Sequence, residues 1–222
     1  IENRIPFLID DGQMYLPFLG LDLKNETRQT KPRASAFSPS AQVIYLYFLY
    51  HQNVSMNTTE CAERFGFSMM TASRALNDLY DAKLLTYMQG GQTQRSKTYH
   101  RIDDGKTYLS KGMEMVKSPV KEVRLVKDAP EGTYVSGMQA LAEFSMLNEP
   151  AEQIRATDEK RFKQIAKEIV EVDEFIENGS CVKLEVWKYD PGLYARGNYV
   201  DRMSLYASLK DDPDERVQQA LE

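Results

Sequence analysis

The 222-residue sequence is poor in the features that mark membrane, disulfide-rich and metal-binding proteins. No stretch approaches the roughly 20 uninterrupted apolar residues of a membrane-spanning helix, so no membrane contact is expected. Only two cysteines and two histidines occur, and they share no short spacing, which argues against a metal site and a disulfide framework. We therefore expect Cys61 and Cys181 to be ordinary buried thiols in a cytoplasmic protein that carries no cofactor.

Motifs of common enzyme classes are missing as well. The sequence has neither a phosphate-cradling glycine loop nor a nucleophile elbow. No pattern pairs acidic residues such as Asp190 and Asp201 as acid and base, and acids near helix starts usually serve as caps. An enzyme is therefore not expected. A pocket in the C-terminal half, lined by several acidic residues with shifted pKa values, would instead favour an enzyme.

Charge is unevenly distributed along the chain, whose net charge is −5. Residues 38–117 hold nine Lys/Arg against seven Asp/Glu, whereas residues 118–222 hold 14 against 21. The mildly basic segment suits modest contact with the phosphates of a nucleic acid, with sequence specificity supplied by contacts to bases in a DNA groove. The acidic segment should repel DNA and better suits a dimer contact, a protein partner or a small-molecule effector.

Two short helices are predicted around a tight turn. Asn57 is a good N-cap, and Glu60 three residues later completes a capping box. Gly66 is a natural left-handed stop, and Ser68 then caps a second helix. Two helices joined by so short a turn form a helix-turn-helix, whose second helix is shaped to enter a major groove.

The second helix has two different sides. Helical spacing places its core side at Ala72, Ala75, Leu76 and Leu79. Its early exposed side carries mostly small hydrogen-bonding groups and one guanidinium: Met70, Thr71, Ser73, Arg74 and Asn77. Residues of these kinds can contact phosphates and base edges.

A hairpin is predicted after the second helix. The runs 86–89 and 97–102 suit two strands, with Gly90 and Gly91 in the loop between them and a polar, partly basic tip at 92–96. Helix, turn, helix and hairpin together predict a winged helix-turn-helix.

This segment resembles the winged helix-turn-helix of bacterial transcription regulators, the MarR-like group in particular. The matching pieces are the 57–66 helix, the run from Thr71 to Leu76 and the Leu84-Leu85 exit. The resemblance implies contact with double-stranded DNA by Ser68, Met70, Thr71, Ser73, Arg74, Asn77, Arg95 and Lys97. Ser68 and Thr71 would hold phosphate, Arg74 and Asn77 would reach phosphate or bases, and Arg95 and Lys97 would belong to the wing.

The flanking sequence predicts further elements. Apolar runs at 5–8 and 14–19 suggest a small hairpin, followed by a polar connector at 24–35. Ser38 and Pro39 start a helix that is apolar almost all round and therefore central. A helix at 103–115 is expected to close the segment that contains the hairpin. In the C-terminal half we expect strands at 120–126, 153–156 and 181–188, and helices at 137–146, 158–165, 200–209 and 213–222.

Three pieces of the C-terminal half resemble the C-terminal domain of antitoxins of the abortive-infection AbiE type and related bacterial regulators. They are residues 134–142, 186–191 and 200–206. The resemblance implies a regulator that represses its own promoter and works beside a toxin.

The sequence thus predicts an α+β protein with a hairpin and connector at 1–37, a winged helix-turn-helix domain at 38–117 and an acidic, mixed α/β domain at 118–222. The expected function is that of a DNA-binding transcriptional regulator, a repressor. A homodimer is expected because one winged helix reads too few base pairs for useful specificity. An antitoxin-like or adaptor protein without DNA is the alternative, and a plasmid or phage replication initiator is a variant of the first reading.

Overall fold

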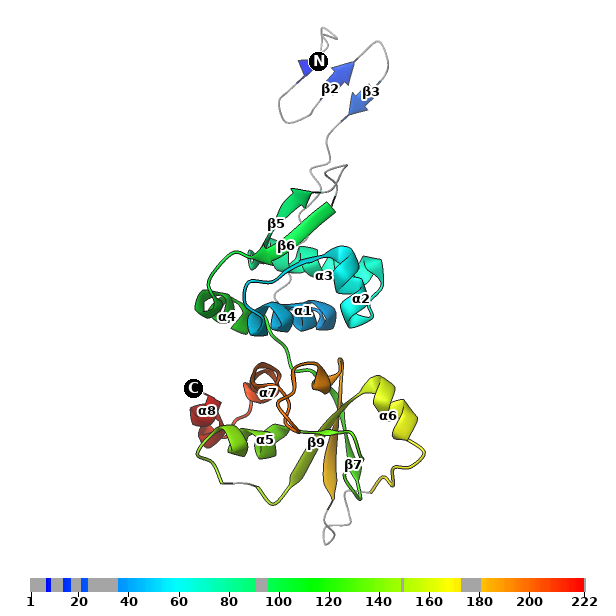
Figure 1. The fold of residues 1–222 in the computed structure, drawn as a ribbon, viewed down its shortest axis with the longest axis vertical. Helices are drawn as coiled ribbons and strands as arrows, with labels where there is room; N and C mark the ends of the chain where they lie inside the picture. Colours follow the sequence, from blue (N-terminus) through cyan, green and yellow to red (C-terminus); the bar gives the residue numbers. More distant parts are fainter. Residues whose placement is uncertain are drawn as a thin grey trace. The chain divides into compact units, whose positions relative to one another are not determined.

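The computed structural model describes residues 7–8, 14–16, 21–23, 36–90, 96–148, 150–172 and 181–221, with side chains described from residue 36 onward. Contacts divide the chain into two compact units, Ile1–Ala34 and Ser35–Glu222. The fold combines helices with small sheets (Figure 1), so the predicted α+β class is confirmed.

The first unit contains three short antiparallel strands. β1 (Phe7–Leu8) pairs with β2 (Met14–Leu16), as the predicted hairpin requires, and β2 pairs with β3 (Leu21–Leu23). The sequence did not predict β3, because three residues are too few to show alternation. The predicted connector at 24–35 lies outside the described residues.

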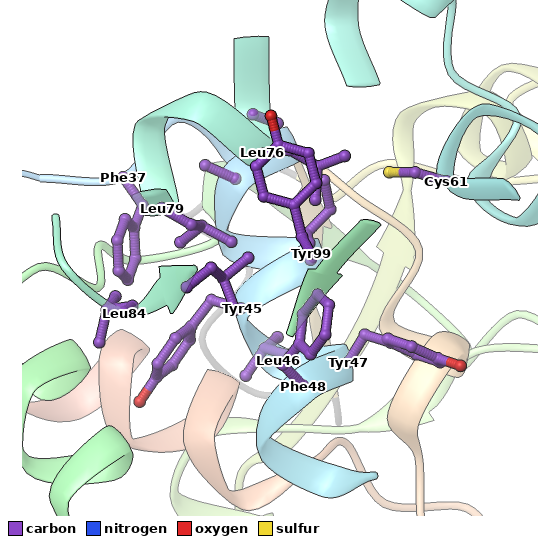
Figure 2. Close-up of a cluster of buried hydrophobic side chains, with 14 of the residues drawn as sticks. Phe37, Tyr45, Leu46, Tyr47, Phe48, Cys61, Leu76, Leu79, Leu84 and Tyr99 are labelled. Atoms are coloured by element: carbon purple, nitrogen blue, oxygen red, sulfur yellow. The ribbon is translucent and has the colours of Figure 1, made fainter. Parts of the chain in front are cut away.

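Helix α1 (Pro39–Tyr50) is the centre of the second unit. Ser38 caps it by accepting a hydrogen bond from the Ala41 N–H, and Pro39 occupies its first turn. Residues 41–48 are all buried. Figure 2 shows Tyr45, Leu46 and Phe48 of this helix beside side chains from other elements, including Leu76 and Leu79. The prediction of a central buried helix is confirmed.

The two predicted helices follow, separated by three residues. They are α2 (Thr58–Phe65) and α3 (Met69–Asp81). The capping box of Asn57 and Glu60 is present, Gly66 has a φ of 65°, and Ser68 caps α3. Each of these local predictions is confirmed.

A three-stranded antiparallel sheet in the order β4-β6-β5 accompanies these helices. It consists of β4 (Ser55–Asn57), β5 (Leu85–Gly90) and β6 (Ser96–Arg101). The predicted hairpin is β5 and β6, although Gly90 ends a strand and does not belong to the loop. β4 was not predicted. It pairs Met56 with Tyr99 and so ties the start of α2 to β6.

Helix α4 (Gly105–Met113) closes this part of the chain, close to the prediction of 103–115. Asp104 caps it by accepting from the Thr107 N–H. Gly112 faces the ring of Tyr45, and a Cβ at this position would overlap that ring. The absence of a side chain therefore lets α4 approach α1.

The remaining chain builds a mixed sheet in the order β7-β10-β9-β8, in which β9 and β10 are parallel and the other neighbours antiparallel. Its strands are β7 (Val120–Val126), β8 (Tyr134–Val135), β9 (Gln153–Asp158) and β10 (Val182–Trp187). The helices are α5 (Gly137–Phe144), α6 (Glu159–Ile165), α7 (Arg202–Leu209) and α8 (Glu215–Leu221), with a 3₁₀ turn at Pro191–Tyr194.

Most of these elements match the sequence predictions, but the two-residue strand β8 was not predicted, and two further points need correction. The helix predicted at 200–209 begins at Arg202, after Asp201 has capped it. Cys181 precedes β10 and is only half-buried, whereas Cys61 is buried as predicted. Within the residues that the structure describes, no helix is long and apolar enough to cross a membrane.

The core around α1 extends into the C-terminal half. Met203 and Ala207 of α7 belong to the same buried cluster as the α1 side chains. Buried Gln42 donates to the Tyr189 hydroxyl over 3.0 Å, and Tyr194 donates to the Val43 carbonyl over 2.8 Å. Residues 35–222 therefore pack as one unit, and the domain boundary near residues 117–119 stays a prediction.

Candidate functional site

Helix α3 has two opposite faces. Its buried face consists of Ala72, Ala75, Leu76 and Leu79, as the sequence predicted. The opposite side carries Met70, Ser73, Arg74 and Asn77. In both sets the later residues follow the first by three, four and seven positions, which places each set on one face of a helix. None of the four residues on the opposite side is buried. We call this row the α3 stripe.

The first turn of α3 is fixed by its own cap. The Ser68 hydroxyl accepts from the Thr71 N–H over 3.1 Å and shares a hydrogen bond with the Thr71 hydroxyl over 2.9 Å. Both hydroxyls thus have partners within the protein. A phosphate at this turn would have to share them or bind to neighbouring backbone N–H groups.

Asn77 is held by the hairpin. The hydroxyl of Tyr99 on β6 donates to Oδ1 of Asn77 over 3.0 Å. Burial raises the pKa of this hydroxyl, which therefore keeps its proton at neutral pH. Oδ1 of Asn77 is consequently used inside the protein, and its Nδ2 is the group that could donate to a phosphate or a base.

A polar pocket of about 340 Å³ lies beside the stripe. Residues of β4, α2, α3 and β6 line it, and their side chains offer hydroxyl, amide and ammonium groups: Asn57, Thr58, Thr59, Ser73, Asn77, Ser96, Lys97 and Tyr99. The pocket brings the start of α2, the stripe and the beginning of β6 to one place. Such a set of groups suits an anionic, hydrogen-bonding ligand.

Lys97 supplies a positive charge to this pocket. Its Nζ lies 4.2 Å from the centroid of the Tyr87 ring on the neighbouring strand. Stacking on an aromatic ring limits the positions of the long side chain without neutralising its charge. Arg95, the other basic residue predicted for the wing, lies outside the described residues.

The structure thus groups three predicted site residues, Ser73, Asn77 and Lys97, around one pocket. Arg74 and Met70 are exposed on the same stripe. The sequence did not predict a site role for Thr58, Thr59, Ser96 or Tyr99. Their contribution depends on the pairing of β4 with β6, for which the short β4 segment gives no periodic signal.

Two carboxylates of the C-terminal half, Glu185 (half-buried) and Asp201 (buried), have structural partners. Oε2 of Glu185 accepts from the Ser136 hydroxyl over 2.7 Å and from the Trp187 indole N–H over 2.9 Å. Oδ1 of Asp201 accepts from the backbone N–H groups of Met203 and Ser204. Burial raises the pKa of both carboxyl groups. Glu185 thus joins Ser136 and Trp187 by hydrogen bonds, and Asp201 caps α7.

A second pocket, of about 270 Å³, lies in the C-terminal half. Charged side chains of both signs line it together with Ile165, Ile169 and Val170: Lys127, Asp128, Glu131, Arg161 and Glu168. Among the residues that the structure describes, no group of three or more His, Cys, Asp or Glu is arranged to hold a metal ion.

Comparisons with models of known protein families and with curated proteins found no match to this chain. The α3 stripe and the pocket beside it are therefore the basis for a functional proposal.

Proposed function

We propose that this protein is a sequence-specific DNA-binding regulator of transcription, a repressor of the bacterial type. In this proposal α2 and α3 form a helix-turn-helix, β5 and β6 form the wing, and α3 enters the major groove of double-stranded DNA. The MarR-like sequence resemblance supports the same arrangement.

One observation carries the proposal. The face of α3 opposite its core is a row of Ser73, Arg74 and Asn77 headed by Met70, and not a second apolar stripe. Guanidinium, amide and hydroxyl groups are those that contact base edges and phosphates. A polar outer face is usual for a surface helix. This row supports DNA contact because it lies on the second helix after a three-residue turn and beside a pocket that contains Lys97.

The pocket gives the phosphate backbone a place to bind. Lys97 supplies a positive charge, and Thr58 and Thr59 belong to the first turn of α2, where backbone N–H groups lack partners within the helix. A phosphate there would lie between the α2 start and the wing. The protein would act as a cytoplasmic homodimer, because a single α3 contacts few base pairs.

A protein-binding adaptor or antitoxin-like protein is the second candidate. It is favoured by three of the exposed methionines, Met69 and Met70 of α3 and Met88 of β5, since methionine is frequent on adaptable binding surfaces. In either case the acidic C-terminal half, with its charged pocket, would bind an effector, a partner or a second copy.

The test is a binding experiment with the full chain. A duplex is selected from a random-sequence pool, and its affinity is measured by fluorescence anisotropy over a series of salt concentrations. Arg74→Ala should weaken binding at least tenfold, and loss of one phosphate contact would make the slope against log salt shallower by about 1. Arg216→Ala is the control, because it removes an equally positive but distant side chain, exposed on α8.

Failure to select any duplex at low or moderate salt would overturn the proposal in favour of the adaptor. Equal effects of the two arginine variants would show that only net charge matters, which contradicts a specific role for α3.

A further inference from the structure

The α3 stripe begins with an exposed apolar side chain. Met70 is 63% exposed and its neighbour Met69 is 52% exposed, although both lie in the first turn of a well-capped helix. Scattered exposed apolar residues are normal on a protein surface. Met70 differs because it shares a row with Ser73, Arg74 and Asn77, the residues proposed to face DNA.

Position and chemistry together restrict what Met70 can contact. In a helix-turn-helix the N-terminal residues of the second helix reach deepest toward the base edges. A thioether side chain offers no strong hydrogen-bond donor or acceptor. Among the groups displayed in the major groove, the thymine C5-methyl is the apolar one. An unbranched, flexible methionine can adapt its rotamers to pack on it.

We propose that Met70 reads a thymine methyl group, so that the DNA bound by this protein contains a thymine opposite the first turn of α3. This inference rests on the proposed function and goes further by naming a base and the atom that is read. Arg74, one helical turn later, would contact the DNA immediately beside that thymine.

The experiment removes the thymine methyl group and leaves every hydrogen-bonding group of the base unchanged. In the duplex selected by the full chain, each thymine is changed singly to deoxyuridine, which lacks only the C5-methyl. Affinities are measured for the wild type, for Met70→Ala and for Met146→Ala. Met146 is a fully exposed methionine of the C-terminal half and serves as the matched control.

One thymine position should stand out. Burial of one methyl group corresponds to a change of about fourfold in affinity, so the wild type and Met146→Ala should each lose about that factor at this position. Met70→Ala should bind the thymine duplex more weakly and should show no further loss when this thymine becomes deoxyuridine. Because the Met70 side chain is exposed, the thermal unfolding midpoint of Met70→Ala should match that of the wild type.

Three outcomes would overturn the inference. If the wild type binds the selected duplex tightly but is indifferent to every deoxyuridine substitution, the proposed function stands and the thymine contact fails. If Met70→Ala retains the wild-type sensitivity at every position, another side chain reads the methyl. If no duplex can be selected, both proposals fail together, and the exposed methionines are assigned to a protein partner.

Discussion

The hydroxyl of Tyr50, at the end of α1, donates a hydrogen bond to Oδ1 of Asp201, the cap of α7, over 2.8 Å. The same carboxylate oxygen accepts from the backbone N–H groups of Met203 and Ser204. Asp201 is only 3% exposed, and a buried carboxylate is costly unless donors surround it. One oxygen atom thus joins the central helix of the N-terminal half to a helix of the C-terminal half.

Tyr50→Phe should lower the free energy of unfolding by about 1–3 kcal/mol, because it removes a hydrogen bond to a charged group and leaves the rest of the ring in place. Urea unfolding measures this change. Asp201→Asn keeps a good capping residue and should cost less than Asp201→Ala. Tyr80→Phe, on the exposed side of α3, is the control and should change stability by less than about 0.5 kcal/mol. Equal losses for the two tyrosine variants would contradict the argument.

The contact of Gly112 with Tyr45 gives a second prediction. Gly112→Ala should destabilise the protein by about 1–3 kcal/mol, because the new methyl group overlaps a ring that is itself fully buried. Thermal or urea unfolding measures the loss. Gly90→Ala is the control, since nothing lies within 4 Å of a Cβ at that position. A neutral Gly112→Ala would mean that α1 and α4 are not packed so closely.

Local chemistry accounts for the features that the sequence predicted well. The Ser38-Pro39 start of α1, the Asn57–Glu60 capping box and the left-handed Gly66 each depend on residues within one helical turn. The two faces of α3 follow from helical spacing alone. For this reason the helices, the hairpin and the exposed stripe could be predicted from the sequence.

Long-range pairing accounts for the features that were missed. β4 has three residues, and its last, Asn57, also caps α2, so the strand is visible only through its pairing with β6. That pairing brings Thr58 and Thr59 to the pocket. The hydrogen bond between Tyr50 and Asp201 joins residues 151 positions apart, and no local sequence pattern around either residue predicts it.

Tyr99 gives a prediction about positioning. Its hydroxyl donates to Oδ1 of Asn77 and so fixes the orientation of an amide that lines the pocket. If Asn77 contacts DNA as proposed, Tyr99→Phe should weaken binding by about threefold to tenfold through loss of this one hydrogen bond. Asn77→Ala and the double variant should then bind alike, because the hydroxyl of Tyr99 acts only through the amide. Anisotropy measures the affinities, and additive losses in the double variant would refute this.

Glu185 gives a prediction for pH. Burial raises its pKa above the ordinary value of 4.5, while the hydrogen bonds from Ser136 and Trp187 and the charge of Lys183 act in the opposite direction. The folded state therefore binds this proton more tightly than the unfolded state does. In the window between pH 4.5 and the raised pKa, the free energy of unfolding must fall as pH rises. Above that window the contribution is constant.

Comparison with Glu185→Gln isolates this group, because the other carboxylates titrate identically in both proteins. As pH is lowered from neutral toward 4.5, the wild type should gain stability relative to the variant, measured by urea unfolding at each pH. Ser136→Ala removes one hydrogen bond that favours the charged form of Glu185. In this variant the gain in stability on lowering the pH should therefore begin at a higher pH. The fluorescence of Trp187, the single tryptophan, should change over the same interval in the folded wild type. A stability difference that is independent of pH, or that grows toward neutral pH in favour of the wild type, would contradict a raised pKa of Glu185.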